Sequence, residues 1–213
     1  GGGIPIPRPL EKRKRDRLPL AEVQGGCLLP SSLSTRPLPN LVMRTLYFSY
    51  GSNLSSRRLL SRAPGARFVT VALLKGYHLR FHKAGRDGSA KCDIEVSDDP
   101  FAKVWGAVYS ITRQDILGLD KVEGRGDGYE QREINLCAPT GGAICAFTYI
   151  ATRIDSALLP YHWYKEHVVR GATEFSLPDR YINQIAATPS LPDPDVERHF
   201  YELAIYLRET HTE

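Results

Sequence analysis

The chain has 213 residues, of which 42% are hydrophobic and 24% are charged, so it can bury a substantial core without disulfide or metal staples. No apolar run approaches the roughly 18 residues that a spanning helix needs, which argues against an integral membrane protein and predicts no membrane partner. The net charge of +4 comes entirely from residues 1–42, which carry seven Lys or Arg and three Asp or Glu. Residues 43–213 are balanced, which disfavours a nucleic-acid partner, because nucleic-acid-binding domains carry their basic excess on the fold itself.

Residues 1–42 are predicted to form a disordered tail. They hold seven of the 15 prolines and show no periodic apolar pattern, so they cannot form long helices or bury enough surface to fold. The basic run Lys12–Arg17 is interpreted as a solvated charge run rather than a localisation signal. The segment lacks the pattern of a secretory signal peptide, and the four cysteines lack CxxC or metal-ligand spacing. We therefore expect free thiols in a reducing, cytoplasmic setting.

Residues 43–213 are predicted to form one α+β domain. Its first element is an aromatic strand over 45–50, which Gly51-Ser52-Asn53 breaks before a helix over 54–63. Further strands are predicted over 68–74, 77–82, 92–96, 103–111, 129–136 and 143–151. Further helices are predicted over 112–120, 158–172, 178–188 and 196–208. Because the strands come mostly first and the helices gather at the C-terminal end, the pattern favours α+β over alternating βαβ units.

The bend Tyr50-Gly51-Ser52-Asn53-Leu54 is the first candidate site. A strand that enters a helix through small residues presents backbone N–H groups, which attract an anionic oxygen or a carboxylate. The bend contains neither the phosphate-loop motif G-x-x-x-x-G-K-[ST] nor the dinucleotide-binding motif G-x-G-x-x-G. On its own residues, a purely structural turn is the favoured interpretation.

The second candidate site is the segment from Leu119 to Tyr129. Glu123 stands at the end of a predicted helix and is followed by three glycines within five residues, which allow the backbone to approach a ligand closely. From the residues alone, a helix stop with a solvated acid remains the alternative. Of the neighbouring acids, Asp120 is expected to pair locally and Asp127 to be exposed.

Together, the two segments resemble the γ-glutamylcyclotransferase family. The resemblance spans about residues 45–195 and rests on LYFSYGSNL (46–54), Leu119-Asp120-x-x-Glu123-Gly124, Tyr129, Tyr164-Lys165-Glu166 with Gly171-Ala172, and Leu177-Pro178-x-x-Tyr181. The YGSNL segment is closer to the γ-glutamyl amino-acid branch than to the γ-glutamylamine branch. Lys121 and Val122 depart from the family pattern and leave the substrate preference open.

The resemblance implies a small mixed β-barrel-like sheet with surrounding helices, no cofactor, no metal and a homodimer. It implies a small-molecule γ-glutamyl substrate, which the enzyme converts to 5-oxoproline and a free amine when the substrate's own α-amine attacks the γ-carbonyl. It places Glu123 as the catalytic acid/base. It places the substrate contacts at Tyr47, Phe48, Ser49, Tyr50, Gly51, Ser52, Asn53 and Tyr164.

Two alternatives remain open at the level of sequence. One is a γ-glutamyl-removing enzyme of a biosynthetic pathway, and the other is a non-catalytic binding module that keeps the same fold. The acid at position 123 disfavours the second, because a binding module has little need of it. His78 and His82 are expected to have surface or loop-packing roles, because a metal site needs a third ligand.

Overall fold

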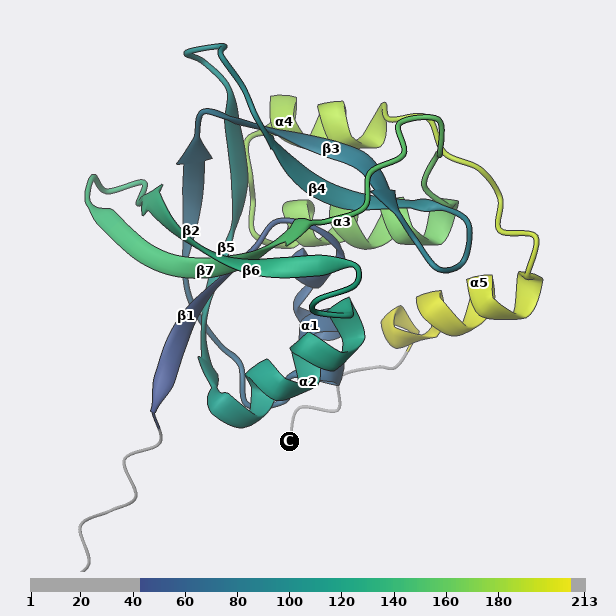
Figure 1. Ribbon diagram of the computed structural model, residues 1–213, viewed down its shortest axis with the longest axis horizontal. Coiled ribbons are helices and arrows are strands. Elements are labelled where there is room, and N and C mark those ends of the chain that lie inside the picture. The colour runs from purple at the N-terminus through teal and green to yellow at the C-terminus, as the bar shows by residue number, and fades with distance from the viewer. Residues whose placement is uncertain (1–42, 208–213) are drawn as a thin grey trace, which may run out of the picture. The chain divides into compact units, whose positions relative to one another are not determined.

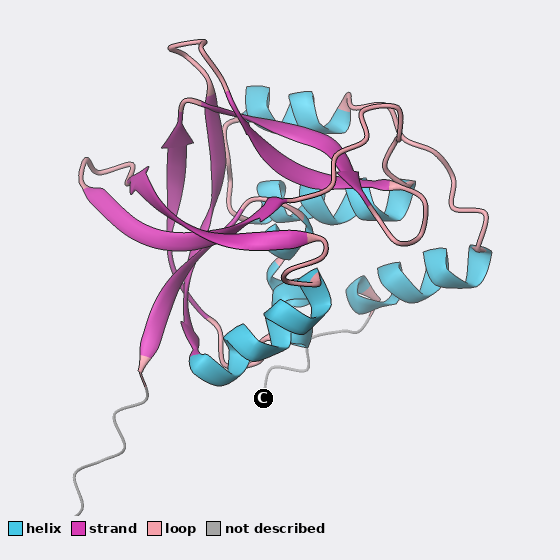
Figure 2. Cartoon of the chain, in the orientation of Figure 1, coloured by secondary structure: helices cyan, strands magenta, loops and turns pink. Residues whose placement is uncertain are grey.

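The computed structural model describes residues 43–207 (Figure 1). The tail predicted over residues 1–42 lies outside the described residues and stays a prediction. The expected α+β class is confirmed, since a closed five-stranded barrel is flanked by helices (Figure 2). Among residues 43–207, no helix is both long and apolar enough to cross a bilayer.

The barrel has the strand order β1-β5-β2-β6-β7. Its neighbours pair antiparallel, except that β1 and β7 close the barrel in parallel, with Tyr47 opposite Phe147. This closure places the first barrel strand beside the last, so the residues that follow β1 lie next to β7. The strands are β1 (Arg44–Ser49), β2 (Arg67–Lys75), β5 (Lys103–Thr112), β6 (Tyr129–Cys137) and β7 (Ala143–Ala151).

A separate two-stranded ribbon is formed by β3 (Tyr77–Ala84) and β4 (Ala90–Val96). Strict alternation would keep Lys83 on the same face as Phe81, but the pairing register shifts between these two residues, so that Lys83 pairs with Lys91. Such an irregularity re-aims the side chains beside it. His82 and Lys83 are both only 7% exposed, and His82 Nε2 lies 2.9 Å from Asp93 Oδ2. Of the two roles expected for His82, the surface role is therefore wrong, because the ring is buried against the Asp93 carboxylate.

The helices begin and end close to their predicted positions, with four differences. The helix predicted over 112–120 continues to Glu123. Ser52–Leu54 forms a 3-10 turn (η1), so the helix predicted from residue 54 begins at Ser56. The helix predicted from residue 158 begins at His162, because the preceding Tyr161 pairs with Leu191 as a β-bridge. The last helix tightens into a 3-10 turn (η2) over Ala204–Tyr206. The α-helices are α1 (Ser56–Arg62), α2 (Arg113–Glu123), α3 (His162–Glu174), α4 (Asp179–Ala186) and α5 (Val196–Leu203).

Helix α3 packs directly on the backbone of η1 through Gly171. A Cβ atom at position 171 would lie 2.3 Å from the Ser55 nitrogen and 2.4 Å from the Leu54 carbonyl carbon. No side chain fits into that gap without moving one of the two segments. The glycine therefore fixes the distance between α3 and the turn that follows β1.

We expect Gly171→Ala to destabilise the protein, although Gly→Ala within a helix ordinarily stabilises it by about 1 kcal/mol. The clash with backbone atoms should reduce the free energy of unfolding by about 1–3 kcal/mol, as overpacking commonly does. Urea denaturation measures the change. The matched control is Thr173→Ala, an exposed position of the same helix, which should stay within about 0.5 kcal/mol of the parent. Equal stability of the two variants would contradict the close contact.

Helix α5 is attached to α1 and α3 by a buried polar cluster. Arg58 of α1 contacts Glu202 of α5, and its NH1 atom lies 2.8 Å from Nε2 of the fully buried His167. The other ring nitrogen, Nδ1, lies 2.7 Å from the hydroxyl of Tyr206. Burial lowers the pKa of His167 to about 4, so the ring is neutral in the folded protein and its Nε2 accepts from Arg58.

This cluster predicts a loss of stability in mild acid. The unfolded chain protonates His167 near pH 6.5 and the folded chain only near pH 4, so the unfolded state binds more protons as the pH falls between these values. Linkage then removes about 1–2 kcal/mol of unfolding free energy between pH 7 and pH 5. His167→Gln lacks the titration, so chemical denaturation at both pH values should show a smaller loss than in the parent. Equal losses would contradict the assignment.

Candidate active site

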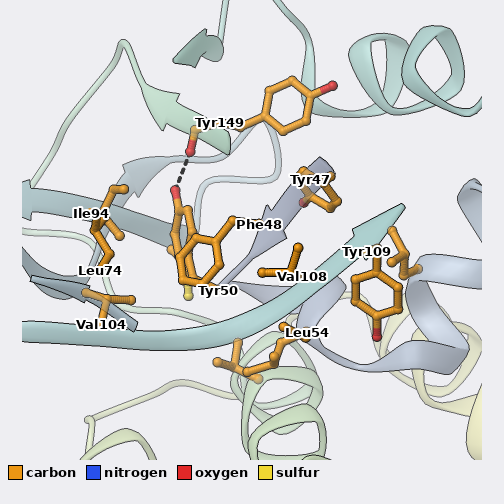
Figure 3. Close-up of a cluster of buried hydrophobic side chains, with 14 of the residues drawn as sticks. Tyr47, Phe48, Tyr50, Leu54, Leu74, Ile94, Val104, Val108, Tyr109 and Tyr149 are labelled. Atoms are coloured by element: carbon orange, nitrogen blue, oxygen red, sulfur yellow. Dashed lines mark hydrogen bonds between the residues drawn. The ribbon is translucent and has the colours of Figure 1, made fainter. Parts of the chain in front are cut away.

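Two hydrogen bonds fix the conformation and the position of the bend after β1. The N–H of Leu54 donates to the carbonyl of Gly51 at 2.9 Å and closes the turn. The Tyr50 hydroxyl donates to the carbonyl oxygen of Tyr149 at 2.5 Å and attaches the bend to β7 (Figure 3). Within residues 43–207, the backbone N–H groups of Gly51 and Ser52 donate to no acceptor. The bend therefore keeps two donors for a ligand.

The opposite wall is formed by Tyr164 of α3. Its hydroxyl accepts the N–H of Cys92 at 2.9 Å, and the hydroxyl of Tyr129 donates to the carbonyl of the same cysteine at 2.8 Å. Two tyrosines from distant elements thus hold the backbone of β4 on both sides of Cys92. The wall is rigid because it is built on strand and helix rather than on a loop.

Glu123 is the last residue of α2. Thr112 and Asp115 form a capping box at the start of that helix, and Gly124 ends it in the left-handed conformation, with φ of 66°. Both ends of the helix are thereby defined, and the carboxylate is carried to a fixed place beside the bend. Its side chain is only 16% exposed.

Asn53 connects Glu123 to the bend. Its Nδ2 donates to Glu123 Oε1 at 3.0 Å and to the Tyr47 hydroxyl at 3.2 Å. Its Oδ1 accepts from Arg62 NH1 at 2.9 Å, which fixes the orientation of the amide. The same guanidinium nitrogen lies 3.6 Å from Glu123 Oε1. The carboxylate is therefore held by one amide and one cation.

These walls enclose an inner cavity with about 300 Å³ of empty space, part of it open to solvent. Seven of the nine residues assigned to the site by sequence line it, namely Glu123, Tyr47, Tyr50, Gly51, Ser52, Asn53 and Tyr164. Phe48 and Ser49 do not line it and are buried in the protein. Strand β1 projects successive side chains to opposite faces, and Phe48 points into the barrel core (Figure 3).

Four further residues line the inner cavity and were not assigned to it by sequence: Cys92, Tyr129, Thr148 and Tyr149. They come from β4, β6 and β7, which are distant from the bend in sequence. Tyr129 follows the glycine-rich loop and had the strongest signal of the four. The others belong to ordinary strand patterns that reveal no site.

The phenols and the thiol that line the inner cavity retain their protons at neutral pH. Burial raises the pKa of the phenols of Tyr47, Tyr129 and Tyr164, and the charge on Glu123 raises each of them further. Burial also raises the pKa of the Cys92 thiol, which makes it a poor nucleophile. Glu123 is the one carboxylic acid among residues 43–207 that lines the inner cavity. It is therefore the best candidate for a group that accepts a proton there.

The neighbouring acids have other partners, as their sequence context indicated. Asp120 pairs locally with Arg125, whose NH1 lies 3.0 Å from Asp120 Oδ2, and it also accepts from Tyr149 at 2.7 Å and from Gln131 at 2.8 Å. Asp127 is exposed and pairs with arginines. Among residues 43–207, no group of three or more His, Cys, Asp or Glu side chains is arranged to hold a metal ion.

A larger outer pocket, with about 1050 Å³ of empty space, adjoins the inner cavity. The two share Ser52, Glu123, Tyr129 and Tyr164, so the carboxylate stands at their junction. The acids of the outer pocket are Asp87, Glu123 and Asp127, whereas six cationic side chains line it: Arg58, Arg62, Lys83, Arg86, Lys91 and Arg153. The outer pocket therefore favours anionic groups.

Known proteins align with most of this domain. A model of the AIG2-like family matches residues 103–185. Curated γ-glutamylcyclotransferases from Mus musculus and Homo sapiens are 34% and 32% identical over 146 residues, which is 67% of this chain and 77% of each relative. A solved structure described as a γ-glutamyl cyclotransferase has a TM-score of 0.67 and 26% identity and covers 78% of this chain and 100% of its own. An uncharacterized protein from Homo sapiens has a TM-score of 0.65 and 29% identity, with 73% and 96% covered.

Proposed function

Because the chain belongs to the γ-glutamylcyclotransferase family and is an enzyme of this type, we propose that it converts γ-glutamyl amino acids to 5-oxoproline and the free amino acid. The observation that carries the proposal is the position of Glu123. This carboxylate lies at the junction of the inner cavity and the outer pocket, opposite the Gly51-Ser52 bend. The scissile bond of a bound substrate would lie at the same junction.

The substrate supplies its own nucleophile. Its α-amine attacks the γ-carbonyl carbon, a C–N bond forms, and a five-membered lactam closes. The amide C–N bond then breaks and releases the amine of the leaving amino acid. If the enzyme holds the γ-glutamyl substrate folded for this attack, the activation barrier can fall by up to about 7–11 kcal/mol, as in well-oriented intramolecular reactions. The reaction therefore requires no nucleophilic side chain from the protein.

Proton transfer is the task left to the protein. An α-amine titrates near about 8, so at neutral pH most of it is ammonium and cannot attack. Glu123 takes a proton from the nitrogen that attacks and delivers one to the nitrogen that leaves. Asn53 and Arg62 hold the carboxylate in place while it does so. The bend supplies the free N–H groups of Gly51 and Ser52 to the substrate's α-carboxylate.

The setting of the enzyme is part of the same proposal. The described cysteines, Cys92, Cys137 and Cys145, are free thiols, which supports a reducing, cytoplasmic setting. We expect the protein to form a homodimer, as the family resemblance implies.

The proposal is tested by incubating the protein with a panel of γ-glutamyl dipeptides and measuring 5-oxoproline. Glu123→Gln keeps the shape of the side chain and removes the proton acceptor, so kcat should fall at least about 100-fold, the lower end for general acid–base catalysis. Glu130→Gln, the same change at an exposed strand position, should retain activity. Release of glutamate instead of 5-oxoproline would reject cyclisation, and a fully active Glu123→Gln would reject the role of this residue.

Ser52 and Tyr164 should respond differently to loss of their hydroxyls. The Ser52 hydroxyl makes no hydrogen bond within residues 43–207 and is free for substrate, so Ser52→Ala should raise KM about 10-fold, the value of one hydrogen bond. Tyr164→Phe leaves the buried Cys92 N–H without an acceptor. It should lower the free energy of unfolding by about 1–3 kcal/mol and raise KM less. The reverse ranking in steady-state kinetics would overturn this assignment.

A further inference from the structure

Lys83 lies in the wall of the outer pocket because of the register shift in the ribbon. The shift between Phe81 and Lys83 turns the lysine inward, where it is 7% exposed. Its Nζ lies 4.9 Å from the centroid of the Tyr129 ring. Tyr129 and Glu123 line the same pocket. The ammonium of a largely buried side chain thus faces the outer pocket beside the junction where the substrate bond would break.

Lys83 differs from the other cations of this pocket, because it has no anionic partner in residues 43–207. Arg62 bonds Asn53, and Lys91 Nζ lies 2.6 Å from Asp87 Oδ2. The remaining arginines of the pocket pair with Glu202 or Asp127. The Lys83 ammonium makes neither a hydrogen bond nor an ion pair with a described residue.

An ammonium in this position is costly without an anion. Burial lowers the pKa of Lys83, while the charge on Glu123 acts in the opposite direction. Removing a charge from water is unfavourable unless a counter-charge or hydrogen bonds replace the solvent. Among residues 43–207, the face of Tyr129 is the one direct contact of the ammonium, and Glu123, Asp87 and Asp127 act on it only from beyond ion-pair distance. The missing partner is therefore best supplied by a ligand in the outer pocket.

The arrangement of the two chambers indicates which part of the ligand meets Lys83. In the proposed function, on which this inference rests, the γ-glutamyl group occupies the inner cavity and Glu123 faces the bond that breaks. The leaving group then extends into the outer pocket, where Lys83 lies. An α-amino acid that leaves through its nitrogen carries a carboxylate one carbon away from that nitrogen.

We propose that Lys83 binds the α-carboxylate of the leaving amino acid and thereby selects γ-glutamyl α-amino acids over γ-glutamyl amines and amides that lack this charge. A lysine acts on a carboxylate as a compact point charge with three donors. The contact replaces water around the ammonium with a paired anion. Lys83 is then a residue of substrate specificity, distinct from the proton transfer at Glu123.

The test uses two substrates that differ mainly in one charge, γ-glutamyl-L-alanine and γ-glutamyl-L-alaninamide. Lys83→Met keeps the apolar stem and removes the ammonium. A hydrogen bond to a charged group contributes about 1.5–3 kcal/mol, so kcat/KM for the acid should fall about 10- to 100-fold. For the amide it should change less than about 3-fold. Lys75→Met, an exposed lysine of β2 outside both chambers, is the matched control and should leave both values unchanged.

Two outcomes would overturn the inference. An equal loss on both substrates would place Lys83 on the shared γ-glutamyl half or in the fold. Unchanged kinetics on both would show that Lys83 does not contact substrate.

A binding measurement separates this inference from the proposed reaction. In the Glu123→Gln background, calorimetry should show tighter binding of γ-glutamyl-L-alanine than of the alaninamide, and Lys83→Met should abolish that difference. If the parent enzyme forms no 5-oxoproline but the Lys83-dependent preference persists, only the proposed reaction fails. If the preference is absent, the role of Lys83 fails whatever the parent enzyme makes.

Discussion

The site depends on one side-chain amide. Asn53 uses both of its N–H groups, on Tyr47 and Glu123, and its oxygen accepts from Arg62. An aspartate in its place would set a second acceptor against Glu123, and an apolar residue would leave buried polar groups without partners. The asparagine of the bend is therefore more than a turn-forming residue, because it joins β1, α1 and α2 around one carboxylate.

That amide can do this only because other parts of the fold set its position. The contact of Gly171 with the backbone after Leu54 fixes η1 against α3. The capping box and the left-handed Gly124 fix the length of α2 and therefore the place of Glu123. Closure of β1 on β7 then brings Tyr149 to the bend. Each of these contacts is local, and the closed barrel brings the segments that they fix together around one cavity.

Local signals in the sequence predicted the fold class, the strands and the bend, because strand alternation, a capping threonine and glycine-rich breaks act over a few residues. The prediction that Glu123 and Asn53 share one site came from the family resemblance, because 70 residues separate them in the sequence and that separation says nothing about their distance in space. Phe48 and Ser49 were included in the site with their neighbours, although strand alternation turns Phe48 into the core. Lys83 was missed because the shift that buries it depends on pairing with β4 and leaves no mark in the pattern of β3.

The net charge of a sequence does not show where charged side chains gather in the folded protein. Residues 43–213 carry no net charge. Folding nevertheless gathers six cationic and three acidic side chains around the outer pocket. At the separations within one pocket, salt screens these charges only partly, because the Debye length is about 8 Å at physiological ionic strength. A balanced chain can thus present a cationic entrance that concentrates anionic ligands and repels cationic ones. Most of those cations already have protein partners, so selectivity for one anionic group falls to Lys83, which has no such partner among residues 43–207.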